Sequence, residues 1–77
     1  MQMLKITEFK ELMVNDTISF NYGGAMCGTL RVLNVHHDRV FAIENWRPED
    51  SFHRNKAFFV TRIEDILAVF RDTGWDA

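Results

Sequence analysis

Near the N-terminus, the hydrophobic positions recur at the spacing of a helix. Phe9, Leu12 and Met13 stand at i, i+3 and i+4, so a helix would carry them on one face. Thr7 offers an N-cap hydroxyl before them, and an Asn-Asp turn pair follows them. The pattern therefore predicts a short helix over about residues 7–14.

From residue 17 the spacing changes to two, which is typical of β-strands. Ile18, Phe20 and Tyr22 alternate with polar residues, and Gly23-Gly24 then indicates a hairpin because both glycines tolerate positive φ. In the returning strand the apolar positions change face at Leu33, which indicates a bulge or a bend. The predicted strands cover about residues 17–22, 26–35, 39–45 and 56–61, with a polar turn at His36-His37-Asp38 between the second and the third.

Residues 62–72 fit two patterns. Ile63, Ile66, Leu67 and Phe70 have helical spacing, and a helix here would give an α+β fold with a four-stranded antiparallel sheet and two helices. Alternatively, residues 62–65 form one tight 3₁₀-like turn and residues 66–70 form a strand. The second pattern gives a mainly β fold, a small SH3-like barrel of about five strands preceded by the helix. The bend in the second strand favours this barrel, as a single domain over residues 1–77.

Several short motifs resemble known small barrels. Ile18-Ser19-Phe20-Asn21-Tyr22, Arg31-Val32 and, after Arg54, Phe58-Phe59-Val60-Thr61-Arg62-Ile63 resemble the WYL-type domain, an SH3-like barrel of bacterial regulators and phage-defence systems. The signature Trp-Tyr-Leu of that family stands as Val40-Phe41-Ala42 in this chain. Gly28-Thr29-Leu30 is similar to the first motif of Sm/Lsm-like barrels. Each resemblance covers roughly two-thirds of the chain and implies the small-barrel fold.

The WYL resemblance implies recognition of a nucleotide or a single-stranded nucleic acid. Arg31, Arg54 and Arg62 would clamp phosphate, and Tyr22 and Trp46 would stack on bases. The charge pattern adds to this hypothesis. The net charge of −2 over 77 residues argues against a strongly basic surface, but residues 31–62 hold six of the nine basic side chains and four of the eleven acids. Arginine binds phosphate bidentately, and each stacked base contributes about 1–3 kcal/mol.

Large aromatic residues in polar surroundings support a different class of function. Trp46 and Phe52 lie in a polar segment and Trp75 lies near the C-terminus, whereas Phe20, Phe41, Phe58, Phe59 and Phe70 are predicted to be core residues. The alternative function is therefore a protein-interaction adaptor or inhibitor, of the kind a phage encodes, that binds a partner protein through the Trp46–Phe52 loop. The small core also leaves homo-oligomerisation open.

The sequence offers little for catalysis or metal binding. Adjacent His36 and His37 would point to opposite faces of a strand, and no spacing suggests a catalytic triad or a phosphate-binding loop, so we expect a non-enzymatic protein without metal or cofactor. The single Cys27 is predicted to be a small buried residue. Apolar runs of about four residues are too short to cross a membrane. The N-terminal residues lack the layout of a signal peptide, so we expect a cytoplasmic location.

Overall fold

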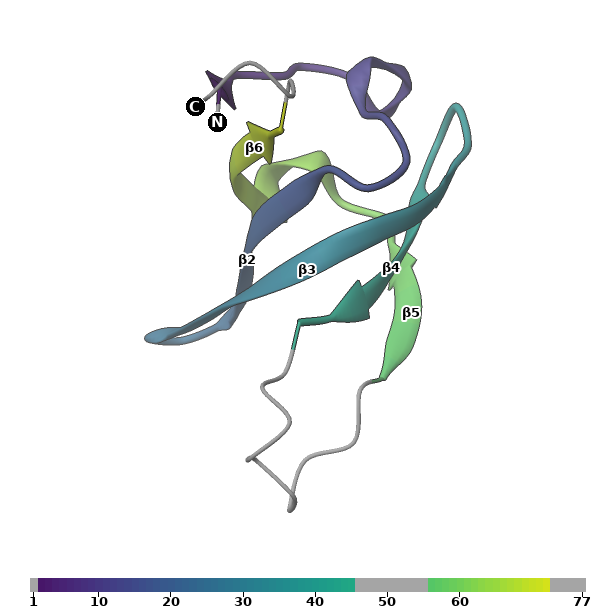
Figure 1. The fold of residues 1–77 in the computed structure, drawn as a ribbon. Helices are drawn as coiled ribbons and strands as arrows, with labels where there is room; N and C mark the ends of the chain where they lie inside the picture. The colour runs from purple at the N-terminus through teal and green to yellow at the C-terminus, as the bar shows by residue number, and fades with distance from the viewer. Residues whose placement is uncertain (1, 46–55, 73–77) are drawn as a thin grey trace.

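The strands of the computed structural model form one antiparallel sheet (Figure 1). The model describes residues 2–45 and 56–72. In chain order the elements are β1 (Gln2–Leu4), the 3₁₀ turn η1 (Phe9–Glu11), β2 (Thr17–Gly23), β3 (Met26–Val35), β4 (Val40–Glu44), β5 (Ala57–Val60), the 3₁₀ turn η2 (Ile63–Asp65) and β6 (Ile66–Arg71). The strands lie in the order β1-β6-β2-β3-β4-β5. Within the described residues the sheet does not close on itself, and β1 and β5 are its edges. The fold is thus mainly β, as the sequence predicts.

The two hairpins form where the sequence places turn residues. Gly23 and Gly24 take positive φ values of 112° and 59°, which glycine adopts without strain, and they turn the chain from β2 into β3. The second turn is closed by the His36 amide, which donates to the Arg39 carbonyl at 2.9 Å. The register of β3 against β4 shifts between Val32 and Asn34, which confirms the irregularity expected around Leu33.

Residues 62–72 form the turn and strand of the second pattern. η2 is a single turn, and β6 then lies between two partners, with Val69 opposite Leu4 of β1 and Ile18 of β2. Val69 is fully buried, since both neighbouring strands and the core enclose it. Strand β1 was not predicted, because three residues are too few to display a period of two.

The predicted helix over residues 7–14 is wrong. The chain makes one 3₁₀ turn, and Leu12 is already extended, with ψ 155°. The Asp16 carboxylate explains the stop, because its Oδ2 accepts a hydrogen bond from the Met13 amide at 2.8 Å, a donor that a continuing helix would use internally. Phe9 and Leu12 are still buried, whereas Met13 is exposed. The apolar residues therefore reach the core without a helix.

The core lies on one face of the sheet and is covered at one end by the N-terminal segment (Figure 1). Its buried apolar residues come from every strand but β1 and from the η1 region: Phe9, Leu12, Ile18, Phe20, Leu30, Val32, Val40, Ala42, Val60 and Val69. Phe20 is thus a core residue as predicted, and Phe58 packs against this cluster. Phe41 and Phe70, also predicted to be core residues, are only half-buried and lie outside this cluster. The burial predictions for Phe59 and Cys27 are wrong, since both are exposed. The side chains of Phe59 and Cys27 lie on the face of the sheet opposite the core. Side chains alternate between the two faces along a strand, and the positions that alternate with these two face inward.

One ion pair joins the end of the sheet to the N-terminal segment. Asp16 is 2% exposed, and its carboxylate accepts two hydrogen bonds from Arg71, one from Nε at 2.9 Å and one from Nη2 at 2.8 Å. Arg71 Nη2 also donates to the Glu11 carbonyl at 3.1 Å. The backbone of Asp16 adds a third link, because its carbonyl accepts from the Val32 amide of β3 at 2.9 Å.

The charge of Asp16 is stabilised by these contacts. Burial raises the pKa of its carboxyl, but the hydrogen bonds from Arg71 and the Met13 amide and the positive charge of Arg71 outweigh burial, so the pKa lies below its ordinary value. A lowered folded-state pKa stabilises the fold above the ordinary value of about 4, and this contribution is lost as the pH falls through the lowered value.

Removing the Arg71 guanidinium leaves the buried Asp16 carboxylate without its charged donor. We expect Arg71→Ala to lower the free energy of unfolding at neutral pH by about 1.5–3 kcal/mol, the usual contribution of hydrogen bonds to a charged group. Urea unfolding measures this difference, which shrinks as the pH falls below about 4 and through the lowered pKa of the Asp16 carboxyl. Arg31→Ala is the matched control, with an expected change within about 0.5 kcal/mol because Arg31 is exposed. Equal effects of the two variants would contradict the role of the ion pair.

Candidate functional site

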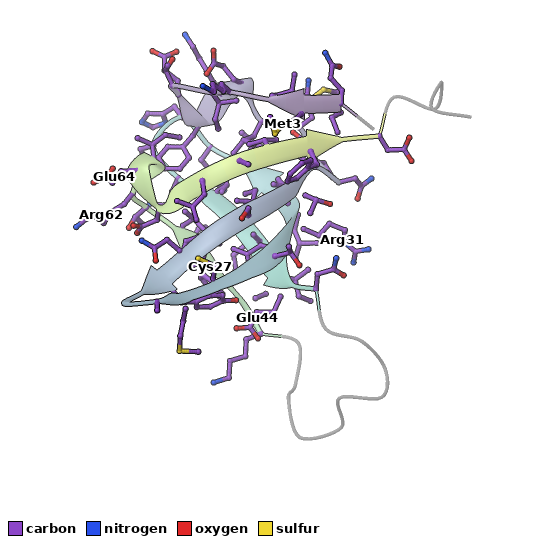
Figure 2. All side chains as sticks on the ribbon, turned by 90° about the vertical axis from the view of Figure 1, so that its left-hand side faces the viewer. Met3, Cys27, Arg31, Glu44, Arg62 and Glu64 are labelled. Atoms are coloured by element: carbon purple, nitrogen blue, oxygen red, sulfur yellow. The ribbon has the colours of Figure 1, made fainter. Side chains whose placement is uncertain are left out.

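The arginines predicted to clamp phosphate do not lie together. Arg31 extends from the middle of β3, whereas Arg62 lies at the start of η2, and the two side chains stand at opposite sides of the molecule in Figure 2. The remaining residues of the predicted sites, Trp46, Phe52, Arg54 and Trp75, lie outside the described residues. The described part of the predicted ligand site is therefore spread over separate surfaces.

The two arginines also differ in their surroundings. Arg62 Nη2 lies 3.0 Å from Glu64 Oε1, and its Nε lies 3.8 Å from Asp65 Oδ2, so its charge is balanced locally. Arg31 is exposed between its cross-strand neighbours Thr17 and Ile43, and it forms no ion pair with a described side chain. Of the two, Arg31 is thus the cation that an anionic ligand reaches without displacing an acid.

Tyr22 is held at the end of the core face. Its ring meets Phe20 edge-on, with centroids 4.9 Å apart, and packs over Gly28, where an added Cβ would lie 2.7 Å from Tyr22 Cε2. Its hydroxyl donates to Glu44 Oε1 at 3.1 Å. Burial, the hydrogen bond to Glu44 and the negative charge of Glu44 together raise the pKa of Tyr22 to about 12. These contacts fix the orientation of the ring, and at 41% exposure part of Tyr22 stays accessible to solvent.

A surface that the sequence did not predict lies on β4 and β5, on the face of the sheet that points away from the core. Phe59 is 48% exposed, and its ring packs against Phe41, with centroids 4.9 Å apart. The Arg39 guanidinium lies over the Phe59 ring, with Cζ 4.8 Å from the centroid, and His36 lies beside it at 6.1 Å. We call these four residues, His36, Arg39, Phe41 and Phe59, the Phe59 surface.

The Phe59 surface was missed because residues 57–60 are apolar on both faces, which resembles a fully buried strand. A signal was present in β4. Val40 and Ala42 alternate with Phe41, and Arg39 has the same parity as Phe41. A cation two residues from an aromatic on one face indicates that this face contacts solvent.

Tyr22 is the single tyrosine of the chain, so its ionisation can be followed directly. We expect tyrosinate absorbance to rise with a midpoint near 12 in the folded protein, compared with about 10 in the unfolded chain. Stability should fall as the pH rises from about 10 through this midpoint, because the unfolded chain loses its proton first. Glu44→Gln and Gly28→Ala should each lower the midpoint, the first by removing a charge and the second by displacing the ring. A native midpoint near 10 would disprove the described contacts of Tyr22.

The described residues contain no group of three or more His, Cys, Asp or Glu side chains arranged to hold a metal ion. None of their helical segments has the length and apolar character needed to cross a membrane. Comparison of the chain with protein-family models, with curated proteins and with solved structures finds no match.

Proposed function

We propose that this protein is a non-enzymatic interaction module, an adaptor or inhibitor, that binds a partner protein through the Phe59 surface. The observation that carries this proposal is an exposed phenylalanine held in place by Phe41 and Arg39 on a strand at the edge of the sheet. Aromatic residues and arginine are the residue types that dominate binding energy at protein interfaces. The separation of Arg31 from Arg62 argues in the same direction, since no phosphate clamp is assembled from the two.

The energies involved are sufficient for an anchor residue. Complete burial of a phenylalanine stabilises a complex by roughly 1.5–3 kcal/mol, and about half of that remains available to Phe59 at 48% exposure. A cation–π contact contributes about 0.5–1 kcal/mol when exposed and about 2 kcal/mol when water is excluded. A partner that covers the Phe59 surface therefore strengthens the contact between Arg39 and Phe59 as well as burying the ring.

The module would have an SH3-like barrel fold. Four consecutive strands, β2 to β5, are followed by the η2 turn and by β6, which returns to pair with β2. This order supports the barrel expected from the sequence, with β1 as an additional strand beside β6. The curvature would come from the register shifts in β2 and β3.

Replacing Phe59 by alanine should remove partner binding and leave the fold intact, because the ring lies outside the core. Leu67→Ala is the matched control: Leu67 is 53% exposed, close to the value for Phe59, but it lies in β6, which has a strand on both sides. Proteins retained by the immobilised wild type should also be retained by Leu67→Ala and lost with Phe59→Ala, with circular dichroism confirming that both variants fold. Retention of the same proteins by all three forms would refute the proposal.

A nucleotide or single-stranded nucleic acid is the second candidate ligand, and the exposed Arg31 favours it. Its cross-strand neighbours are Thr17 of β2 and Ile43 of β4, and its own side chain is exposed, so a phosphate can reach the guanidinium. Fluorescence anisotropy with labelled oligothymidylate and with a labelled mononucleotide tests it. Saturable binding that weakens with salt and is lost in Arg31→Ala is the expected result for this candidate, and a flat titration at low salt eliminates it.

A further inference from the structure

The outer edge of β5 carries backbone groups that no described strand uses. The Glu44 amide donates to the Lys56 carbonyl at 2.9 Å, which makes these two residues a hydrogen-bonded pair. In an antiparallel ladder such pairs alternate, so Phe58 and Val60 bond to β4, whereas Ala57 and Phe59 direct their amides and carbonyls away from it. Two donors and two acceptors thus point outward along β5.

The side chains of β5 match this arrangement. Val60 is buried and Phe58 packs against the core, while Ala57 and Phe59 extend from the opposite face. Phe59 therefore contributes both outward-directed backbone groups near the middle of the edge and the aromatic ring of the Phe59 surface. The other sheet edge, β1, has three residues and no aromatic side chain.

We propose that β5 binds an extended segment of a partner protein as an added strand, with an Asp or Glu of that segment beside Phe59 and Arg39. This inference rests on the proposed function and specifies its partner. The strand addition uses the outward amides and carbonyls of Ala57 and Phe59. Affinity then comes from the backbone hydrogen bonds, and selectivity comes from the side chains of the added strand that face Phe59.

The positive charge beside Phe59 favours a partner segment that carries an acidic residue. The Arg39 guanidinium lies over Phe59, on the face of β5 that its ring occupies. Arg39 Nη1 meets Asp38 Oδ2 at 4.0 Å, the outer limit of an ion pair, and both side chains are about half exposed, so the contact is weak. Donors of the guanidinium remain for a second carboxylate, which arginine can bind through two parallel hydrogen bonds.

The same charges disfavour a second copy of this chain. Antiparallel pairing of two β5 strands about a two-fold axis at Phe58 would place Lys56 of one copy opposite Val60 of the other, and the four residues of β5 supply no carboxylate for Arg39. Cationic side chains are also a known protection of sheet edges against self-pairing. The edge is thus suited to an acidic strand and poorly suited to itself.

The test begins with a library of random short peptides displayed on phage and selected on the immobilised full-length protein. Selected peptides should be rich in Asp or Glu and in β-branched residues at alternate positions. Binding of one synthetic selected peptide is then measured for four variants. Ala57→Pro removes one outward amide without touching the ladder to β4, a position where an edge strand tolerates proline, and should abolish binding. Arg39→Gln should weaken binding roughly fivefold, and Arg31→Gln, the matched control, should leave it unchanged.

The fourth variant, Arg39→Glu, should reverse the preference, so that a peptide with Lys in place of its acidic residue binds better than the original. Failure of the library to yield binders, selected peptides without acidic residues, or unchanged binding by Ala57→Pro would each overturn strand addition. A dimer in light scattering that Ala57→Pro dissociates would overturn the acidic occupant in favour of a second copy. If Phe59→Ala loses its partner protein and Ala57→Pro keeps it, strand addition is wrong and the proposed function stands; if both variants keep the partner, both are wrong.

Discussion

The buried carboxylate of Asp16 connects three parts of the chain that are distant in sequence. The carboxylate accepts hydrogen bonds from the Arg71 guanidinium at the end of β6 and from the Met13 amide of the N-terminal segment. The backbone carbonyl of Asp16 accepts a further hydrogen bond from the Val32 amide of β3. A carboxylate that is 2% exposed is tolerable in a protein interior only when such donors compensate for its lost hydration. The segment that covers the core and the strand that completes the sheet are therefore fixed by the same group.

The ion pair between Asp16 and Arg71 lies at one side of the sheet and leaves the edge at the other side available for binding. With Arg71 bound to Asp16, β6 is held against β2 and β1 is added beside it, so that side of the sheet is built from the two ends of the chain. The opposite side ends at β5, whose four residues pair with β4 alone among the described strands. The interaction that organises the core and the surface proposed for binding thus lie at opposite ends of the strand order. A partner can bind β5 without disturbing the buried ion pair.

Much of the sheet could be predicted because half-buried strands display their faces in the sequence. The sequence predicts β3 at residues 26–35, because Leu30 and Val32 lie on either side of Arg31 at a spacing of two and because Gly23-Gly24 marks the turn before them. The N-terminal helix could not be excluded in this way, since Phe9 and Leu12 have helical spacing and the Asp16 contact that ends the turn depends on tertiary structure. Similarly, Phe59 looks like a core residue within residues 57–60, and its exposure follows only from β5 being an edge strand.

Amide hydrogen exchange of the isolated, isotope-labelled protein measures whether β5 presents a free hydrogen-bonding edge to partners. We expect the exchange rates to alternate within β5. The amides of Phe58 and Val60, which bond to β4, should exchange slowly, whereas those of Ala57 and Phe59 should exchange at nearly the rate of an unstructured chain. Strong protection of all four amides in the isolated protein would mean that the edge is already covered and that β5 offers no free backbone groups to a partner.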